Sequence, residues 1–320
     1  MNWKDDGEGA QAMNQGFVAL EQEIGKVVIG QEQVVRSLLI SIFSQGHCLL
    51  VGVPGLAKTL LIQTVSRALD LSFNRIQFTP DLMPSDIVGS ETMDQNRNFK
   101  FMRGPIFANI ILADEINRTP PKTQAALLES MQEYAVTVAG QKYPLDRPFF
   151  VLATQNPIEQ EGTYPLPEAQ LDRFMFNLQV GYPSFEDEVR IVESTTTEKS
   201  EPVRKVMGSE EIIAFQQLVR RVPVTRNVTE YAVRLVAKTR PNTELASVEA
   251  NQFLEWGAGP RASQNLILAA KCHSLMAGKY SPDIEDVRAV SLEVLRHRVV
   301  RNFRAEAEGH SVESLINRML

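Results

Sequence analysis

The stretch Gly52-Val-Pro-Gly-Leu-Ala-Lys58-Thr59 constrains this 320-residue chain more than any other feature. An apolar run at residues 47–51 precedes it, and a helix-like run at residues 60–69 follows it. This order of strand, glycine-containing turn, Lys-Thr and helix is typical of a phosphate-binding loop. In such a loop, successive backbone N–H groups and the positive end of the helix point at phosphate oxygens. The alternative is an ordinary strand–turn–helix with a surface lysine.

The loop residues have distinct expected roles. Lys58 would reach the β- and γ-phosphates of a nucleotide, and Thr59 would ligate Mg²⁺. Ala57 departs from the usual G-x-x-x-x-G-K-[ST] pattern, because a second glycine is typical at that position. Since alanine disfavours positive φ, we expect Ala57 to adopt the right-handed helical region already. The residues expected to contact the nucleotide in this stretch are Gly52, Val53, Pro54, Gly55, Leu56, Ala57, Lys58, Thr59 and Leu60.

The composition is that of a soluble globular protein, with 43% hydrophobic and 22% charged residues. The formal net charge of −6 disfavours a large nucleic-acid interface, which usually needs a basic surface. Cys48 and Cys272 lie in apolar runs, so we expect buried thiols in a reducing compartment. The four scattered histidines suggest no metal site. No apolar run approaches ~20 residues and the first residues are polar, so we expect a cytoplasmic protein without membrane insertion.

Strands alternate with helices over residues 45–180, which predicts a mostly parallel, three-layer α/β sheet. Strand patterns fade after Pro183, which predicts an α/β domain at residues 1–190 and a helical domain at residues 205–320. The expected helices beyond that point are residues 184–197, 209–221, 227–240, 260–277 and 282–301. Three local features are also expected: a flexible polar segment at 1–15, an irregular insertion at 80–105 with a possible strand near Phe99, and a hairpin at 134–148.

Polar residues follow two of the buried strands. Asp114 and Glu115 end the apolar run at residues 109–113, and Asn156 follows the run at residues 149–154. Ligands bind outside the carboxyl ends of parallel strands, so these side chains are expected at one edge. Asp114 could hold Mg²⁺, Glu115 could accept a proton from the attacking water or orient it, and Asn156 could hold the water or the γ-phosphate. A helix-capping acidic pair and a plain turn are the alternatives.

Two arginines are candidates for stabilising phosphate charge. Arg173 follows a short helix and could reach a neighbouring subunit's nucleotide; an intrachain pair with Glu168 or Asp172 is the alternative. Arg261 lies in the first turn of a helix, where the dipole disfavours a cation, so we expect a nearby anion or a solvated side chain. A further basic cluster is expected to be a solvated helix face; it comprises Arg296, Arg298, Arg301 and Arg304.

The chain resembles the MoxR family of AAA+ ATPases over about residues 25–305. The segments that carry the resemblance are residues 52–59 with Ala57, 112–118, 153–157, 168–174 and 259–262. The resemblance implies a P-loop (AAA+) parallel-sheet domain followed by a small all-α lid, with residues 80–105 as an insertion in the second helix. By motif match, Lys58 and Thr59 would be the Walker A residues, and Asp114 and Glu115 the Walker B residues. Asn156 would be sensor 1, Arg173 the arginine finger and Arg261 sensor 2. The residues facing adenine would be Val28, Ile29 and Gly30.

The same resemblance implies what such a protein does and with whom. It implies Mg²⁺-dependent ATP hydrolysis by a homo-oligomeric ring, commonly a hexamer, that acts as a chaperone-like remodeller of protein clients. Partners with von Willebrand factor A (VWA) domains, complex maturation and metal-cofactor insertion are associated with this family. A nucleic-acid-stimulated motor and a nucleotide-gated scaffold are the alternative functions, and whether Arg261 acts in cis or in trans stays open.

Overall fold

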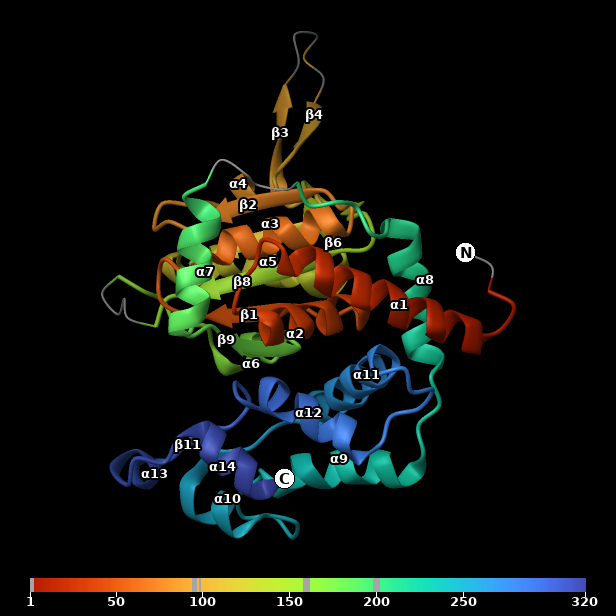
Figure 1. Cartoon of the computed structure of the whole chain (residues 1–320). Helices are drawn as coiled ribbons and strands as arrows, with labels where there is room; N and C mark the ends of the chain where they lie inside the picture. Colours follow the sequence, from red (N-terminus) through yellow and green to blue (C-terminus); the bar gives the residue numbers. More distant parts are fainter. Residues whose placement is uncertain (1–2, 94–96, 98, 158–161, 198–201) are drawn as a thin grey trace.

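A computed structural model describes residues 3–93, 97, 99–157, 162–197 and 202–320. Its centre is a five-stranded sheet in the order β2-β5-β8-β1-β9, and every neighbouring pair of strands is parallel (Figure 1). The strands are β1 (Cys48–Val51), β2 (Phe73–Gln77), β5 (Ile110–Asp114), β8 (Phe150–Gln155) and β9 (Phe176–Gln179).

Helices cover both faces of the sheet, and the central strands are apolar on both faces for that reason. Alternate residues of β5 show the arrangement: Ile110 and Leu112 join one core cluster, whereas Ile111 and Ala113 join the other. The first cluster includes α1 (Asp6–Gly25), α2 (Glu32–Phe43) and α3 (Lys58–Ala68), and the second includes α5 (Pro121–Glu133). The predicted three-layer α/β class is therefore confirmed.

The first helix corrects one expectation. Residues 1–15 were expected to be flexible, but α1 begins at Asp6, and the side chain of Asp5 caps it by accepting a bond from the Glu8 N–H at 2.8 Å. The helix buries an apolar stripe at helical spacing: Ala10, Met13, Phe17, Leu20 and Ile24. Burial of this stripe orders a segment whose polar composition suggested otherwise. Residues 1 and 2 lie outside the described part of the chain.

Two hairpins project from the α/β body. The segment after α4 (Pro84–Val88) forms β3 (Gly89–Met93) and β4 (Phe99–Arg103), which confirms the strand expected near Phe99 (Figure 1). The expected hairpin at residues 134–148 is also confirmed, as β6 (Ala135–Val138) and β7 (Gln141–Pro144). The two hairpins touch, because Phe101 stacks on Tyr143 with ring centroids 4.1 Å apart.

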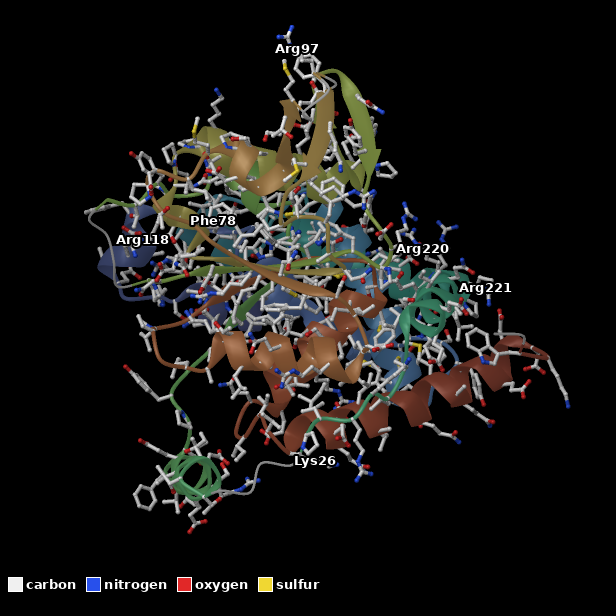
Figure 2. All side chains as sticks on the ribbon, turned by 90° about the horizontal axis from the view of Figure 1, so that it is seen from above. Lys26, Phe78, Arg97, Arg118, Arg220 and Arg221 are labelled. Carbon is white, nitrogen blue, oxygen red and sulfur yellow. The ribbon has the colours of Figure 1, made fainter. Side chains whose placement is uncertain are left out.

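The chain after β9 is mainly helical. Helix α7 (Phe185–Thr195) buries none of its residues and stands away from the sheet (Figure 2). Helix α8 (Ser209–Arg221) contacts α1 and α2 as well as the lid helix α11 (Pro260–Met276; Figure 1). The division into residues 1–190 and 205–320 thus remains a prediction. The remaining elements are α9 (Arg226–Lys238), α10 (Val248–Phe253), β10 (Leu254–Trp256), α11 (Pro260–Met276), α12 (Ile284–Leu295), β11 (Val300–Arg301), α13 (Phe303–Ala307) and α14 (Val312–Met319).

The basic cluster was wrongly predicted to be a solvated helix face. Helix α12 ends at Leu295, not at residue 301, and the side chain of Arg298 is only 2% exposed. The Arg298 guanidinium donates to the backbone carbonyls of Phe174 and Met175 at 2.6 and 3.2 Å. Arg296 donates to the Asn177 carbonyl at 2.7 Å. These bonds fasten the lid to the edge strand β9 and to the two residues just before it, whose unpaired carbonyls need donors.

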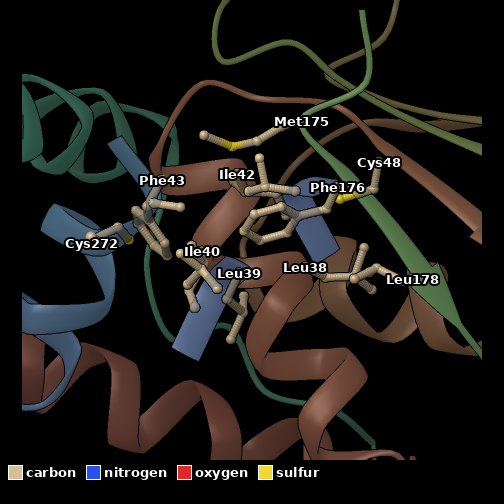
Figure 3. Close-up of a cluster of buried hydrophobic side chains, with 14 of the residues drawn as sticks. Leu38, Leu39, Ile40, Ile42, Phe43, Cys48, Met175, Phe176, Leu178 and Cys272 are labelled. Carbon is tan, nitrogen blue, oxygen red and sulfur yellow. The ribbon is translucent and has the colours of Figure 1, made fainter. Parts of the chain in front are cut away.

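Helix α2 lies between β9 and α11 and joins the α/β body to the lid (Figure 3). Phe43 on α2 is fully buried, as is Phe176 on β9. Both cysteines belong to this same core, and burial raises the pKa of the Cys48 and Cys272 thiols to about 12. The expectation of two buried free thiols is therefore confirmed.

Candidate active site

The phosphate-binding loop connects β1 to α3 and has two residues in the left-handed region. Gly55 has φ +86°, and Ala57 has φ +53° and ψ +27°. The expectation that Ala57 is already right-handed is therefore wrong. A left-handed residue next to right-handed ones makes a concave nest of N–H groups that suits an anion. The requirement of that nest overrides the preference of alanine, at a cost of about 1–2 kcal/mol.

Lys58 begins α3, and its ammonium group donates to the carbonyl of Gly52 at the start of the same loop. Burial lowers the pKa of Lys58, while the charges of Asp114 and Glu115 act to raise it. The lysine is thus a partly desolvated cation between the loop and two carboxylates. The hydroxyl-bearing Thr59 follows it and is half-buried.

Thr154 positions both carboxylates at the end of β5. Its hydroxyl donates to Asp114 Oδ1 at 2.6 Å and accepts from the backbone N–H of Glu115 at 2.8 Å. Glu115 has φ +57°, a strained conformation that this bond helps to hold. Sequence reasoning missed Thr154 because it reads as part of a buried strand. No local sequence signal marks it, because its role depends on the register of β8 against β5: Ala113 pairs with Ala153, so the hydroxyl is level with Asp114.

Strand β2 adds two donors that sequence reasoning also missed. Arg75 donates to Asp114 Oδ2 through Nε and Nη2, at 3.0 and 2.6 Å. Gln77 Nε2 donates to Glu115 Oε2 at 2.8 Å, and Arg118 reaches the same oxygen at 3.1 Å. The sequence signal was two polar residues spaced by two on a strand, which places them on one face. A metal ion at Asp114 would replace or share the contact with Arg75.

Three strand ends meet at this edge of the sheet, because β8 lies between β5 and β1. Val51 pairs with Gln155, and the Gly52 N–H bonds to the Gln155 carbonyl at 3.4 Å. Asn156 is the next residue and is buried. The structure therefore brings the loop, Asp114, Glu115 and Asn156 together, as predicted from the strand pattern.

The segment expected to face adenine lies beside the loop. Gln31, the next residue after Gly30, donates from Nε2 to the Leu56 carbonyl at 3.2 Å. Its Oε1 is buried, and no residue in the described ranges donates to it. An orphaned acceptor next to a phosphate nest fits the amino group of an adenine nucleotide. Val28 is buried, and Gly30 has φ +73°. The residues present thus suit ATP, and Gln31 is a further candidate contact that the family resemblance did not imply.

Within the described residues, neither candidate arginine bonds to the phosphate-binding loop, and Asp172 links the two. Arg261 Nη1 donates to Asp172 Oδ2 at 3.0 Å, and Arg298 Nε donates to Asp172 Oδ1 at 2.7 Å. Asp172 is the residue before Arg173. The Arg173 side chain borders an open cavity of about 300 Å³ with Glu129, and within the described part of the chain nothing hydrogen-bonds to its guanidinium.

The described residues contain no group of three or more His, Cys, Asp or Glu side chains placed to hold a metal ion. None of their helices is long and apolar enough to cross a bilayer.

Comparison with known protein families defines the class of protein to which the chain belongs. The family described as "ATPase family associated with various cellular activities (AAA)" matches residues 47–176, and "AAA lid domain" matches residues 247–319. The fold, the loop and these matches define an AAA+ ATPase with a lid. The chain is 42% identical to Chaperone MoxR1 of Mycobacterium tuberculosis over 98% of its length and 84% of that protein. It therefore belongs to the MoxR family.

Two further comparisons agree. Protein MoxR of Methylorubrum extorquens is 30% identical over 87% of this chain and 86% of that protein. A crystal structure of a Cytophaga hutchinsonii protein is 41% identical and superposes with a TM-score of 0.91, covering 98% of this chain and 95% of the other.

Proposed function

We propose that this chain is a Mg²⁺-dependent ATPase that forms a homo-oligomeric ring and remodels protein clients. One observation carries the proposal: the phosphate-binding loop, two carboxylates and an amide meet at one edge of the sheet, while no side chain in the described ranges bonds to the Arg173 guanidinium, which leaves it able to act on a second copy. Membership of an ATPase family supports the reaction, and the name of the M. tuberculosis relative supports a chaperone role.

The binding step uses the loop and two metal ligands. The N–H nest around Ala57 and the ammonium group of Lys58 would hold the phosphates, releasing Lys58 from the Gly52 carbonyl. Thr59 and Asp114 would hold Mg²⁺, directly or through water. When bound, Mg²⁺ neutralises phosphate charge.

The hydrolytic step uses Glu115 and Asn156. Glu115 would accept a proton from the attacking water or orient it, and Asn156 would orient the water or the γ-phosphate from the neighbouring strand end. The Gln77 amide holds Glu115 Oε2 at 2.8 Å. This bond keeps the side chain at the sheet edge, and it must be shared or broken when Glu115 engages the water.

We assign Arg173 and Arg261 to the neighbouring subunit's nucleotide. Arg261 is tied to Asp172, next to Arg173, so both guanidiniums belong to one surface of the chain. An arginine supplied in trans stabilises the charge of the phosphoryl-transfer transition state, which raises the rate by several orders of magnitude. The trans assignment of Arg261 rests on this pairing with Asp172, and a heterologous ring interface would bring both residues to the next site.

The projecting β3–β4 hairpin is the proposed client contact. It exposes Met93, Phe99 and Met102, whose side chains are 59%, 70% and 55% exposed, and Arg97 lies near its far end (Figures 1 and 2). Exposed apolar side chains on a projecting element suit a partly unfolded protein. Family membership further supports a hexameric ring, a VWA-domain partner, a cytoplasmic location and roles in complex maturation or metal-cofactor insertion. The net charge of −6 argues against nucleic acid as the client.

The test replaces the proposed base. Glu115→Gln should retain ATP binding and lower the hydrolysis rate by about 10²–10⁴-fold, because general base catalysis contributes that much. Glu230→Gln is the matched control, since Glu230 pairs with Arg226 on the exposed side of α9, outside the site, and should leave the rate unchanged. Binding is measured by calorimetry and turnover by phosphate release. Full turnover by Glu115→Gln would overturn the assignment.

A further inference from the structure

A second polar cavity lies at the opposite end of the sheet from the phosphate-binding loop. It has a volume of about 410 Å³, and its lining includes Gln45, just before β1, and Phe149, just before β8. The cavity therefore lies at the amino ends of these parallel strands, whereas the nucleotide site uses their carboxyl ends. The volume is within the range of small-molecule sites, roughly 300–1,000 Å³.

Two arginines of this cavity lack a negative partner. Arg147 and Arg220 both line it, and in the part of the chain that the structure describes neither makes an ion pair with a carboxylate. The adjacent Arg221 behaves differently, because it pairs with Asp6 at 2.9 Å; both arginines are on the last turn of α8 (Figure 2). A chain with net charge −6 thus leaves two cations uncompensated in one hollow.

The positive charge of the cavity extends to its neighbours. Lys271 donates to the Arg220 carbonyl at 3.0 Å, and its pKa is lowered by burial and by the charge of Arg220. Burial raises the pKa of Tyr134, whereas the charges of Arg147 and Arg220 oppose that rise.

The two guanidiniums are held in place but keep free donors. Arg220 Nε donates to Gln45 Oε1 at 3.0 Å, and Arg147 stacks over the Tyr134 ring at 4.9 Å from its centroid. Gln45 is itself fixed, because its carbonyl accepts from the Tyr134 hydroxyl at 3.3 Å and its amide donates to Gln216 at 3.3 Å. The terminal nitrogens of Arg220 and the N–H groups of Arg147 have no acceptor among the described residues. Preorganised arginine donors match phosphate oxygens in a bidentate manner.

We propose that this cavity binds the phosphate group of a small molecule between Arg147 and Arg220. A phosphate dianion neutralises both cations, and the remaining volume, walled by Gln216 and Gln217, accommodates a small polar body. The site is separate from the ATP site and does not depend on the proposed hydrolysis.

Isothermal titration calorimetry tests the proposal on the full chain carrying Lys58→Ala, so that the phosphate-binding loop contributes little. The probes are pyrophosphate and ribose 5-phosphate, with ribose as the uncharged control. We expect both phosphates to bind with Kd below about 1 mM and ribose not to bind. The double replacement Arg147→Gln and Arg220→Gln should weaken phosphate binding at least tenfold, and Arg221→Gln should leave it unchanged.

Contradicting outcomes are equally definite. Equal affinity in the double variant, or no phosphate binding by the parent in that range, would overturn the proposal. So would binding of a glutamate-rich peptide in place of both phosphates, since that would identify a protein partner. Circular dichroism checks folding, and if the double variant unfolds, Arg220→Gln alone replaces it. Arg220→Lys should then recover part of the affinity, because it restores the charge without the bidentate donors.

Discussion

Arg298 offers the sharpest stability test, because two arginines share one carboxylate in different surroundings. Arg298 bonds Asp172 Oδ1 and its side chain is 2% exposed; Arg261 bonds Oδ2 and its side chain is 44% exposed. Arg298 also donates to carbonyls of Asp172, Phe174, Met175 and Val294. Burial lowers the pKa of Arg298, whereas the bond to Asp172 raises it.

We expect Arg298→Met to lower the free energy of unfolding by about 3–5 kcal/mol. Removing one partner of a buried pair costs about that much, and the abandoned carbonyls of Asp172, Phe174 and Met175 add to the loss. Arg261→Met should cost less than about 1 kcal/mol, because exposed pairs contribute little and are screened by salt. The identical replacement on the same carboxylate makes Arg261 the matched control.

Urea unfolding followed by circular dichroism measures both variants, with the m-value checked for a change in the transition. Asp172→Asn in each background measures the coupling, which should be large with Arg298 and small with Arg261. Equal losses for the two arginines, or a loss below about 1 kcal/mol for Arg298, would refute the reasoning that burial decides the difference.

Three further predictions concern His47, Ala57 and Thr154. Burial lowers the pKa of His47 to about 4, and its Nδ1 accepts from the Val151 N–H. The unfolded chain therefore binds a proton at this histidine before the folded chain does, once the pH falls below ~6.5. The free energy of unfolding should drop by ~3 kcal/mol between pH ~6.5 and ~4, and urea titrations of His47→Gln should show a weaker dependence on pH. Ala57→Gly should raise the free energy of unfolding by about 0.5–1 kcal/mol, because glycine relieves the left-handed strain but loses more entropy; an unchanged or lower midpoint would contradict this. Thr154→Val should lower kcat at least tenfold with little change in KM, and Thr154→Ser should recover it; an unaltered kcat would remove Thr154 from the positioning of Glu115.

Much of the fold follows from local patterns. Buried parallel strands are apolar on both faces, so residues such as Ile110 and Leu112 marked β5 without ambiguity, and the polar residue that ends each strand marked the site edge. The nearness of Asp114 to Asn156 was predictable for that reason.

Other features depended on what lies opposite each residue, which a local pattern does not contain. The contact of Arg75 with Asp114 requires β2 to lie next to β5, and the burial of Arg298 requires the lid to reach the segment that leads into β9. The left-handed φ of Ala57 follows from the geometry of the nest and not from the preference of alanine. The order of residues 6–15 was missed for another reason, since polar composition concealed an apolar stripe of period 3.6.

The measurement that tests the central claim most directly is ATP turnover in mixtures of Glu115→Gln and Arg173→Ala chains. Each variant alone should be nearly inactive. In mixed rings an intact Glu115 meets an intact Arg173 at about a quarter of the interfaces when the chains mix equally at random, so activity should reappear in the mixture. Absence of activity at every ratio, while exchange of labelled chains proves that mixed rings form, would contradict a site completed by the neighbouring subunit.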